Sequence, residues 1–262
     1  MNTRHLMIVL LVLFTAGTVQ AKLVARPVAY TQDGVQLEGY LAYDDAAAGK
    51  RPGVLVVHEW WGLNDYVRGR AEKLAGMGYV AFALDMYGKG RETAHPDQAG
   101  AWMKAVNSNR DLWLKRALAG LEVLKKQPQV ETAHLAAIGY CFGGATVQVL
   151  AYSGADLQGV VSFHGSLIPP TPDEGQRTKA KMLICHGALD PFNKPEALTD
   201  YVQALNATSI DWQLIVYGNT RHGFTNPDAA KFGMDALAYN PDSDRRSWQE
   251  MTFFFNEIFR DK

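Results

Sequence analysis

Cysteine is scarce in this chain of 262 residues, and its scarcity limits the kind of fold that the chain can have. Cys141 and Cys185 are the two cysteines of the sequence. A small scaffold held together by disulfides needs more, so stability must come from buried apolar side chains. With 47% hydrophobic and 20% charged residues, the composition is that of a globular protein with enough apolar material for one large core.

Clusters of basic charge are also missing. The chain has 26 Lys and Arg residues against 27 Asp and Glu residues, and no stretch concentrates the positive ones. Nucleic-acid binding calls for a clustered basic surface. We therefore expect no nucleic-acid partner.

Long apolar runs are missing as well, and the one near the start is short. The segment from Leu6 to Phe14 falls well below the roughly 20 residues that span a bilayer. Arg4 precedes it, and Val19-Gln20-Ala21 follows as a small-residue cleavage signal. We expect residues 1–21 to be a cleaved export signal and the protein to be periplasmic or secreted, without stable membrane insertion after cleavage. The alternative is an uncleaved anchor.

The rest of the chain alternates strand and helix patterns, without linkers or repeats. A hairpin is expected around Gln32-Asp33-Gly34. Further strands are expected at Gly53–His58, Tyr79–Asp85, His134–Tyr140, Gly159–Phe163, Lys181–Cys185 and Trp212–Tyr217. Their unalternated apolar character is typical of parallel strands buried on both faces.

Helical patterns lie between these strands. One helix is expected after Asn64, one from Pro96 to Val106, one along the leucines of 114–124, and a last one capped by Ser243. The aromatic stripe of the last helix, which includes Trp248 and Phe255, is expected to dock on the sheet. Residues 22–262 should therefore form one α/β domain, a doubly wound and mostly parallel sheet of about eight strands with helices on both faces.

The strongest motif is Gly139-x-Cys141-x-Gly143, between a predicted strand and a helix-competent stretch. It is the pattern of a nucleophile elbow, with cysteine in place of serine, and a sharp turn of this kind needs glycine beside its central residue. A helix N-terminus favours an anion and eases the ionisation of a thiol. Cys185 lies inside a later strand, so we expect at least one strand between the cysteines, no disulfide, and burial of Cys185 in the core.

Two more reactive residues follow later strands. Asp190 comes after the strand beginning at Lys181, and His222 after the strand ending at Tyr217. The order nucleophile, acid, histidine is that of α/β-hydrolases. His222 is expected to move the proton of Cys141, and Asp190 to orient His222. The thiolate would then attack an acyl carbonyl to form a thioester. The backbone N–H of Phe142 and one from His58-Glu59-Trp60-Trp61-Gly62 would stabilise the oxyanion.

These residues resemble the dienelactone hydrolase family (carboxymethylenebutenolidase-like) over about the whole mature chain. The resemblance is carried by His58-Glu59-Trp60-Trp61-Gly62-Leu63-Asn64, Asp85-Met86-Tyr87, Gly139-Tyr140-Cys141-Phe142-Gly143-Gly144, His186-Gly187-x-x-Asp190 and His222-Gly223-Phe224. It implies an α/β-hydrolase fold and a small-molecule ester or lactone substrate. It also implies a triad of Cys141, Asp190 and His222, and an oxyanion hole formed by the backbone of Trp60 and Phe142.

By the same resemblance, Glu59 lies near the nucleophile and switches position when substrate binds, to deprotonate the thiol. Until then its charge would disfavour the thiolate, which could protect an exported cysteine from oxidation. The chain departs from the family at the substrate clamp. Asn226 stands where the family has an arginine, and the helix from Pro96 to Val106 has no arginine.

We therefore expect an ester or lactone hydrolase that need not act on dienelactone. A general short-chain carboxylesterase and a thioesterase are the alternatives. Trp61, Tyr87 and Phe224 are candidates for an aromatic substrate pocket, alongside Trp60, or else for packing residues.

Two other classes of protein remain open. His58, His164, His186 and His222 all lie near strand ends, where a zinc site is conceivable, but the usual close ligand pairs are absent. We expect no metal and no cofactor. The second alternative is a catalytically silent binding protein on the same fold, because fold does not fix function. The sequence leaves the oligomeric state open.

Overall fold

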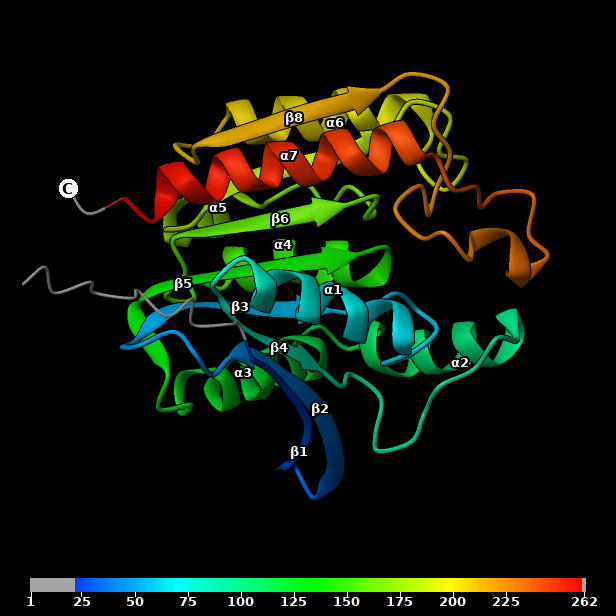
Figure 1. Cartoon of the computed structure of the whole chain (residues 1–262). Coiled ribbons are helices and arrows are strands. Elements are labelled where there is room, and N and C mark those ends of the chain that lie inside the picture. The colour runs from blue at the N-terminus through cyan, green and yellow to red at the C-terminus, as the bar shows by residue number, and fades with distance from the viewer. Residues whose placement is uncertain (1–21, 261–262) are drawn as a thin grey trace, which may run out of the picture.

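An eight-stranded sheet runs through the described residues, 22–260, of this computed structural model (Figure 1). The order across the sheet is β1-β2-β4-β3-β5-β6-β7-β8. The strands are β1 (Leu23–Gln32), β2 (Val35–Asp44), β3 (Arg51–Val57), β4 (Val80–Leu84), β5 (Val130–Tyr140), β6 (Gly159–Phe163), β7 (Lys181–Gly187) and β8 (Trp212–Tyr217). The expected export signal at 1–21 and the last two residues lie outside the described part of the chain.

The sheet is parallel from β4 to β8, and β1 and β2 form an antiparallel hairpin at its edge. In the hairpin turn, Asp33 and Gly34 both have positive φ, at 47° and 77°. This is the conformation that lets a two-residue turn match the strand twist. The expected hairpin and parallel sheet are confirmed.

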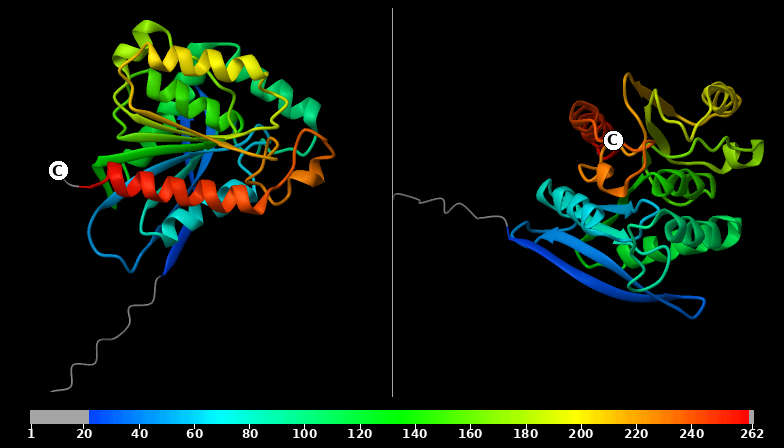
Figure 2. Two further views of the ribbon diagram at one scale, coloured as in Figure 1. Left: turned by 90° about the horizontal axis from the view of Figure 1, so that it is seen from above. Right: turned by 90° about the vertical axis from the view of Figure 1, so that its right-hand side faces the viewer.

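Helices cover both faces of the sheet (Figure 2). On one face lie α1 (Asp65–Gly76) and α7 (Pro241–Ile258), and on the other α3 (Arg110–Lys125), α4 (Phe142–Tyr152) and α6 (Pro195–Asn206). Alternate residues of one strand serve the two cores: Val54 and Val56 pack with α1, and Leu55 and Val57 with α3 and α4. Helix α2 (Pro96–Asn107) packs on α3, and the short helix α5 (Pro172–Arg177) lies between β6 and β7 in the chain. None of the described helices is long and apolar enough to cross a membrane.

The helix starts agree only in part with those predicted from the sequence. Asn64 caps α1 as expected, since its side chain accepts the N–H of Val67. The prediction that Ser243 caps the last helix is wrong: Asn240 is the cap, and its side chain accepts the N–H of Ser243 at 3.1 Å. Pro241 takes the first helical position, which suits proline because no N–H partner is needed there. The aromatic stripe of α7 is buried against the sheet as predicted.

The strand order brings the chemically interesting loops together. The chain passes from β3 outward to β4 and then returns to β5 on the other side of β3. In a doubly wound sheet, ligands bind beside such a reversal, at the carboxyl ends of the strands. Glu59 follows β3 and Cys141 follows β5, so both stand at this point.

Candidate active site

Cys141 sits at the turn between β5 and α4, with φ of 54° and ψ of −113°. This is strained backbone for a residue with a side chain, as expected for a nucleophile elbow. The glycines around it are required by space. A Cβ on Gly139 would overlap the carbonyl of Gly143, and a Cβ on Gly143 would overlap the carbonyl of Val57. The local sequence therefore folds this way because glycine lets β3, β5 and α4 approach closely.

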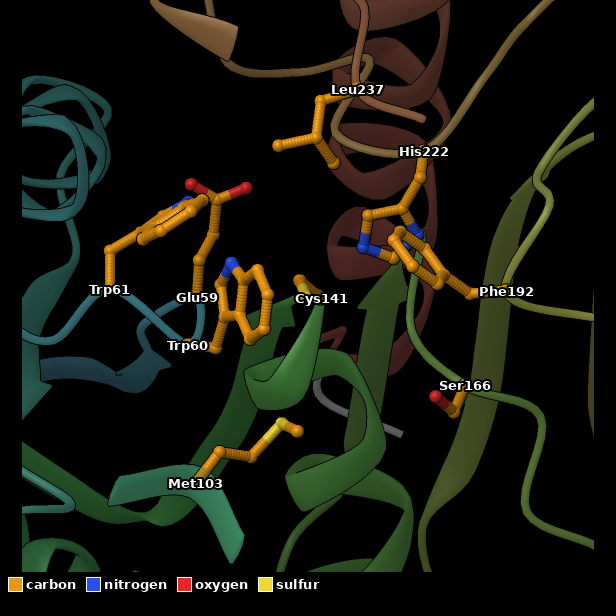
Figure 3. Close-up of a pocket in the computed structure, with 9 residues that line it drawn as sticks. All are labelled: Glu59, Trp60, Trp61, Met103, Cys141, Ser166, Phe192, His222 and Leu237. Atoms are coloured by element: carbon orange, nitrogen blue, oxygen red, sulfur yellow. The ribbon is translucent and has the colours of Figure 1, made fainter. Parts of the chain in front are cut away.

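His222 and Asp190 form a buried pair beside the cysteine. The Nδ1 atom of His222 lies 2.8 Å from Oδ2 of Asp190. The Nε2 atom is buried and has no hydrogen-bond partner among the described residues. Figure 3 shows the imidazole turned toward Cys141 across the pocket. The three residues predicted as a triad are thus brought to one place, with the imidazole held by the acid and its other nitrogen available.

Charge sets the protonation of this pair. Burial disfavours a charged imidazole, but a thiolate at Cys141 and the carboxylate of Asp190 outweigh it and raise the pKa of His222 to about 10, so the imidazolium forms as the thiol gives up its proton. Burial likewise opposes ionisation of Asp190, yet its hydrogen bond with His222 keeps the pKa of the carboxyl below its ordinary value. Asp190 is therefore an anion that favours the imidazolium form of His222.

Asp190 has a second function in the structure. Its Oδ1 atom accepts the backbone N–H of Phe192 at 2.9 Å, and Asn193 donates to Oδ2 at 3.3 Å. These bonds shape the turn that presents Phe192 at the mouth of the site. The ring of Phe192 is half exposed and lies edge-on to His222, with centroids 4.8 Å apart. One carboxylate therefore orients both the base and an apolar wall of the site.

Glu59 is buried and lines the same pocket. Burial raises the pKa of its carboxyl to about 7, although the hydrogen bond from Asn226 and the charges of His222 and Arg70 act in the opposite direction. Asn226 donates to Oε2 of Glu59 at 2.7 Å. Its own Oδ1 atom accepts the N–H of Asp228 at 2.9 Å, which fixes the orientation of the amide. Asn226, at the position where the resemblance predicts an arginine, therefore holds Glu59 through a neutral amide.

The two expected oxyanion donors occupy suitable places in the chain. Phe142 is the first residue of α4, and the first N–H groups of a helix have no acceptor within that helix. Trp60 follows Glu59 in the loop after β3 and lines the pocket. The use of these two N–H groups as an oxyanion hole stays a prediction.

The pocket has a volume of about 280 Å³ and is mostly apolar. Its lining residues are Glu59, Trp60, Trp61, Met103, Cys141, Ser166, Phe192, His222 and Leu237 (Figure 3). Met103, Ser166, Phe192 and Leu237 were not expected from the sequence. Phe192 alone had a signal, its place two residues after Asp190 beyond a strand end; the others come from helix α2 and distant loops.

Two of the three aromatic candidates lie elsewhere. Trp61 lines the pocket and stacks on Phe232, with ring centroids 3.9 Å apart. Tyr87 is not among the lining residues: it packs behind the elbow against Phe142. Phe224 is fully buried and contacts the ring of His164. The expectation for Tyr87 and Phe224 is corrected, because both rings fill the core that supports the site.

No lysine or arginine is among the lining residues of this pocket. Two arginines near the site in sequence are engaged elsewhere. Arg110 pairs with Glu174 at 2.7 Å, and Arg221 donates to the carbonyl of Asp235 at 2.7 Å. The lining thus offers no lysine or arginine to clamp a substrate carboxylate.

The histidines near the strand ends do not assemble into a metal-binding group. Within residues 22–260, no three His, Cys, Asp or Glu side chains are placed so that they could hold a metal ion. His58 bonds through Nδ1 to the carbonyl of Glu59 and through Nε2 to the N–H of Met86. This ring is therefore used to connect two loops.

Comparison with known proteins identifies the family. The model of the dienelactone hydrolase family matches residues 37–259, which is most of the chain. The chain belongs to the dienelactone hydrolase family. It is 27% identical over 238 residues to Protein usf of Aquifex pyrophilus, with 88% of this chain and 97% of that protein covered. An Aquifex aeolicus protein that carries the name carboxymethylenebutenolidase is also 27% identical over 238 residues, covering 89% and 98%.

Two solved structures of the family are similar to this chain over most of its length. The structure named m3DLH has 42% identity and a TM-score of 0.87, covering 91% of this chain and 99% of its own. A dienelactone hydrolase-like promiscuous phosphotriesterase from metagenomic libraries, P91, has 37% identity and a TM-score of 0.88, covering 92% and 100%. The chain is thus a hydrolase of the dienelactone hydrolase family with the α/β-hydrolase fold.

Proposed function

We propose that this dienelactone hydrolase family member cleaves a carboxylic ester or lactone, with Cys141 as nucleophile. The observation that carries the proposal is that Cys141 and His222 line one apolar pocket, with Asp190 bonded to Nδ1 of the histidine at 2.8 Å. That bond leaves Nε2 of His222 for the thiol proton.

The reaction proceeds in two halves. His222 takes the proton of Cys141, and the thiolate bonds to the acyl carbon while the carbonyl oxygen gains charge beside the N–H groups of Trp60 and Phe142. The ester C–O bond breaks, and His222 returns its proton to the departing alcohol. Water then loses a proton to His222 and attacks the thioester, the C–S bond breaks, and the proton goes back to Cys141.

A panel of substrates tests the proposal and its substrate class. Lactones, aryl esters and acyl thioesters are compared as pairs with and without a free carboxylate. Because the pocket lining has no Lys or Arg, the carboxylate member of each pair is expected to show a kcat/KM no higher than its neutral partner. A neutral phosphotriester is added because the similar P91 carries that activity in its name.

The outcomes of the panel are separable. Preference for thioesters would favour a thioesterase, and preference for small aryl esters a general carboxylesterase. A strong preference for carboxylates would show that another cation replaces the family clamp. Failure to hydrolyse any member would favour a silent binding protein and overturn the proposal.

Glu59 is proposed to gate the thiol. Its carboxyl, with a pKa of about 7, is charged above that pH and repels a thiolate in the same pocket. In Glu59→Gln, alkylation of Cys141 by iodoacetamide is therefore expected to reach half of its maximal rate at a lower pH than in the wild type. The rate is measured from pH 5 to pH 10, a range that includes the pKa of Glu59 and the ordinary thiol pKa of about 8.5.

A gating role makes the pH profile decisive. An unchanged midpoint in Glu59→Gln would contradict it. The same repulsion disfavours the thiolate, which suits the export that we propose from residues 1–21, because a thiolate oxidises more readily than a thiol.

A further inference from the structure

A buried histidine joins the nucleophile turn to the loop of the base. His164 follows β6 directly and is fully buried, with φ of 41°. Its backbone N–H donates to the carbonyl of Cys185 at 2.8 Å. Its Nδ1 atom accepts the backbone N–H of Cys141 at 3.1 Å, a hydrogen that is shared with the carbonyl of Phe163 at 3.0 Å. The imidazole therefore bonds directly to the backbone of Cys141, the strained residue of the elbow.

The other nitrogen of the same ring reaches the loop that carries His222. Nε2 of His164 lies 2.7 Å from the hydroxyl of Thr225, three residues after His222. The rings of His164 and His222 also meet edge to face, with centroids 5.1 Å apart. A single side chain thus contacts both the turn of Cys141 and the loop of His222.

Thr225 is held on its remaining sides. Its hydroxyl is 2.6 Å from the hydroxyl of Tyr66 on α1, and its carbonyl accepts a hydrogen bond from Arg70. Arg70 is buried and forms an ion pair with Asp244 of α7 at 2.8 Å. The loop is therefore anchored to two helices, and His164 transmits that anchor to the elbow.

The hydrogen bonds define the form of the ring. Because Nδ1 accepts from a backbone N–H, the hydrogen of the neutral ring must be on Nε2, where it is donated to Thr225. Burial holds the pKa of His164 well below its ordinary value, and the positive charges of His222 and Arg70 act in the same direction. A neutral imidazole with one acceptor and one donor end is what this connection requires.

We propose that His164 is a positioning residue that fixes Cys141 and His222 at reacting distance by bonding the elbow at Nδ1 and the base loop, through Thr225, at Nε2. The inference rests on the proposed function, in which these two residues exchange a proton. A misplacement of about 1 Å between reacting groups lowers rates by about 100-fold. The connection is therefore expected to act on kcat and on the reactivity of the thiol, with little effect on substrate binding.

Matched substitutions test each end of the connection. His164→Asn keeps an acceptor near the Nδ1 position, tolerates positive φ, and loses the donor to Thr225. Thr225→Val breaks the same bond from the other side, and Thr225→Ser keeps it. The first two variants are expected to lower kcat by about 10- to 100-fold with KM within about two-fold. The serine variant should stay near the wild type, and the double variant should lose no more than either single one, since both remove one interaction.

Thiol alkylation separates this inference from the proposed function. The rate of Cys141 with iodoacetamide at pH 7 needs no ester turnover, and it is expected to fall about 10-fold in His164→Asn and Thr225→Val. Tyr66→Phe removes the other partner of the Thr225 hydroxyl and should change the rate less than about two-fold.

Two results would contradict the proposed role of His164. Lower thermal midpoints with unchanged alkylation and kcat would show that His164 is merely structural, and a loss in Tyr66→Phe equal to that in Thr225→Val would assign the effect to Tyr66. Either result would overturn the inference. If the wild type hydrolyses nothing, the proposed function fails, and the alkylation comparison still decides the role of His164.

Discussion

Alanine in place of Cys141 is expected to lower the hydrolysis of p-nitrophenyl acetate by about 10⁴- to 10⁶-fold, the range seen when a nucleophile is removed from a triad. Without the thiol, His222 has no group to deprotonate, and attack is left to water. The elbow should remain folded, because alanine has the same Cβ as cysteine and adds no strain at the φ of 54°. Steady-state kinetics with purified protein measures the loss.

The same substrate offers a direct view of the intermediate. Intact-mass analysis after rapid acid quenching is expected to show an acetyl group on Cys141 in the wild type and none in Cys141→Ala. Cys141→Ser provides the matched control, since it keeps a nucleophile of the same shape with a less acidic hydroxyl. Equal rates of hydrolysis in the wild type and the alanine variant would exclude Cys141 as the nucleophile.

Asparagine in place of Asp190 is expected to lower kcat by about 10⁴-fold with a smaller change in KM. The reason lies in what each of the two carboxylate oxygens contacts. Its Oδ1 atom accepts the N–H of Phe192, so the amide oxygen of asparagine would take that side. The amide NH₂ would then face Nδ1 of His222, and the ring would hold its hydrogen on Nε2, where it cannot accept the thiol proton.

The pKa of His222 provides a second readout for this variant. The charge of Asp190 contributes to raising that pKa to about 10, so the value is expected to fall in Asp190→Asn. An NMR titration of the His222 ring measures it. Asp242→Asn is the control for the loss of an acidic group, since Asp242 is exposed on α7 and pairs with Arg245. An Asp190→Asn enzyme with wild-type kcat would exclude an orienting role for this acid.

The sequence was most informative where local chemistry determines structure. Gly139 and Gly143 flank Cys141 because no side chain fits there, so the elbow could be read from the motif alone. The strands were recognisable because burial on both faces leaves continuous apolar runs, although β5 begins at Val130, four residues before the predicted start. The extra residues pair with β3 before a register shift, which a pattern of apolar residues does not reveal.

Contacts between segments that are distant in the sequence could not be predicted from such local patterns. Asn226 was recognised as a departure from the family, but its bond to Glu59 joins residues 167 positions apart. Phe224 and Trp61 are both aromatic residues beside reactive loops, and only packing places one in the core and the other in the pocket. His164 could be placed only near a strand end, because a hydrogen bond to Thr225 leaves no trace in the local sequence.

The shared use of Asp190 has a consequence for how this pocket can change over evolutionary time. The turn carrying Phe192 is built on the same carboxylate that orients His222, so an insertion there would disturb the base as well as the wall. The side chains of Met103 and Leu237 are freer to vary, because neither side chain bonds to Asp190 and only backbone atoms join the segment of Leu237 to His222. New specificities are therefore expected to arise first by substitution on the sides contributed by α2 and by the loop before α7, while the length of the turn after Asp190 stays constant.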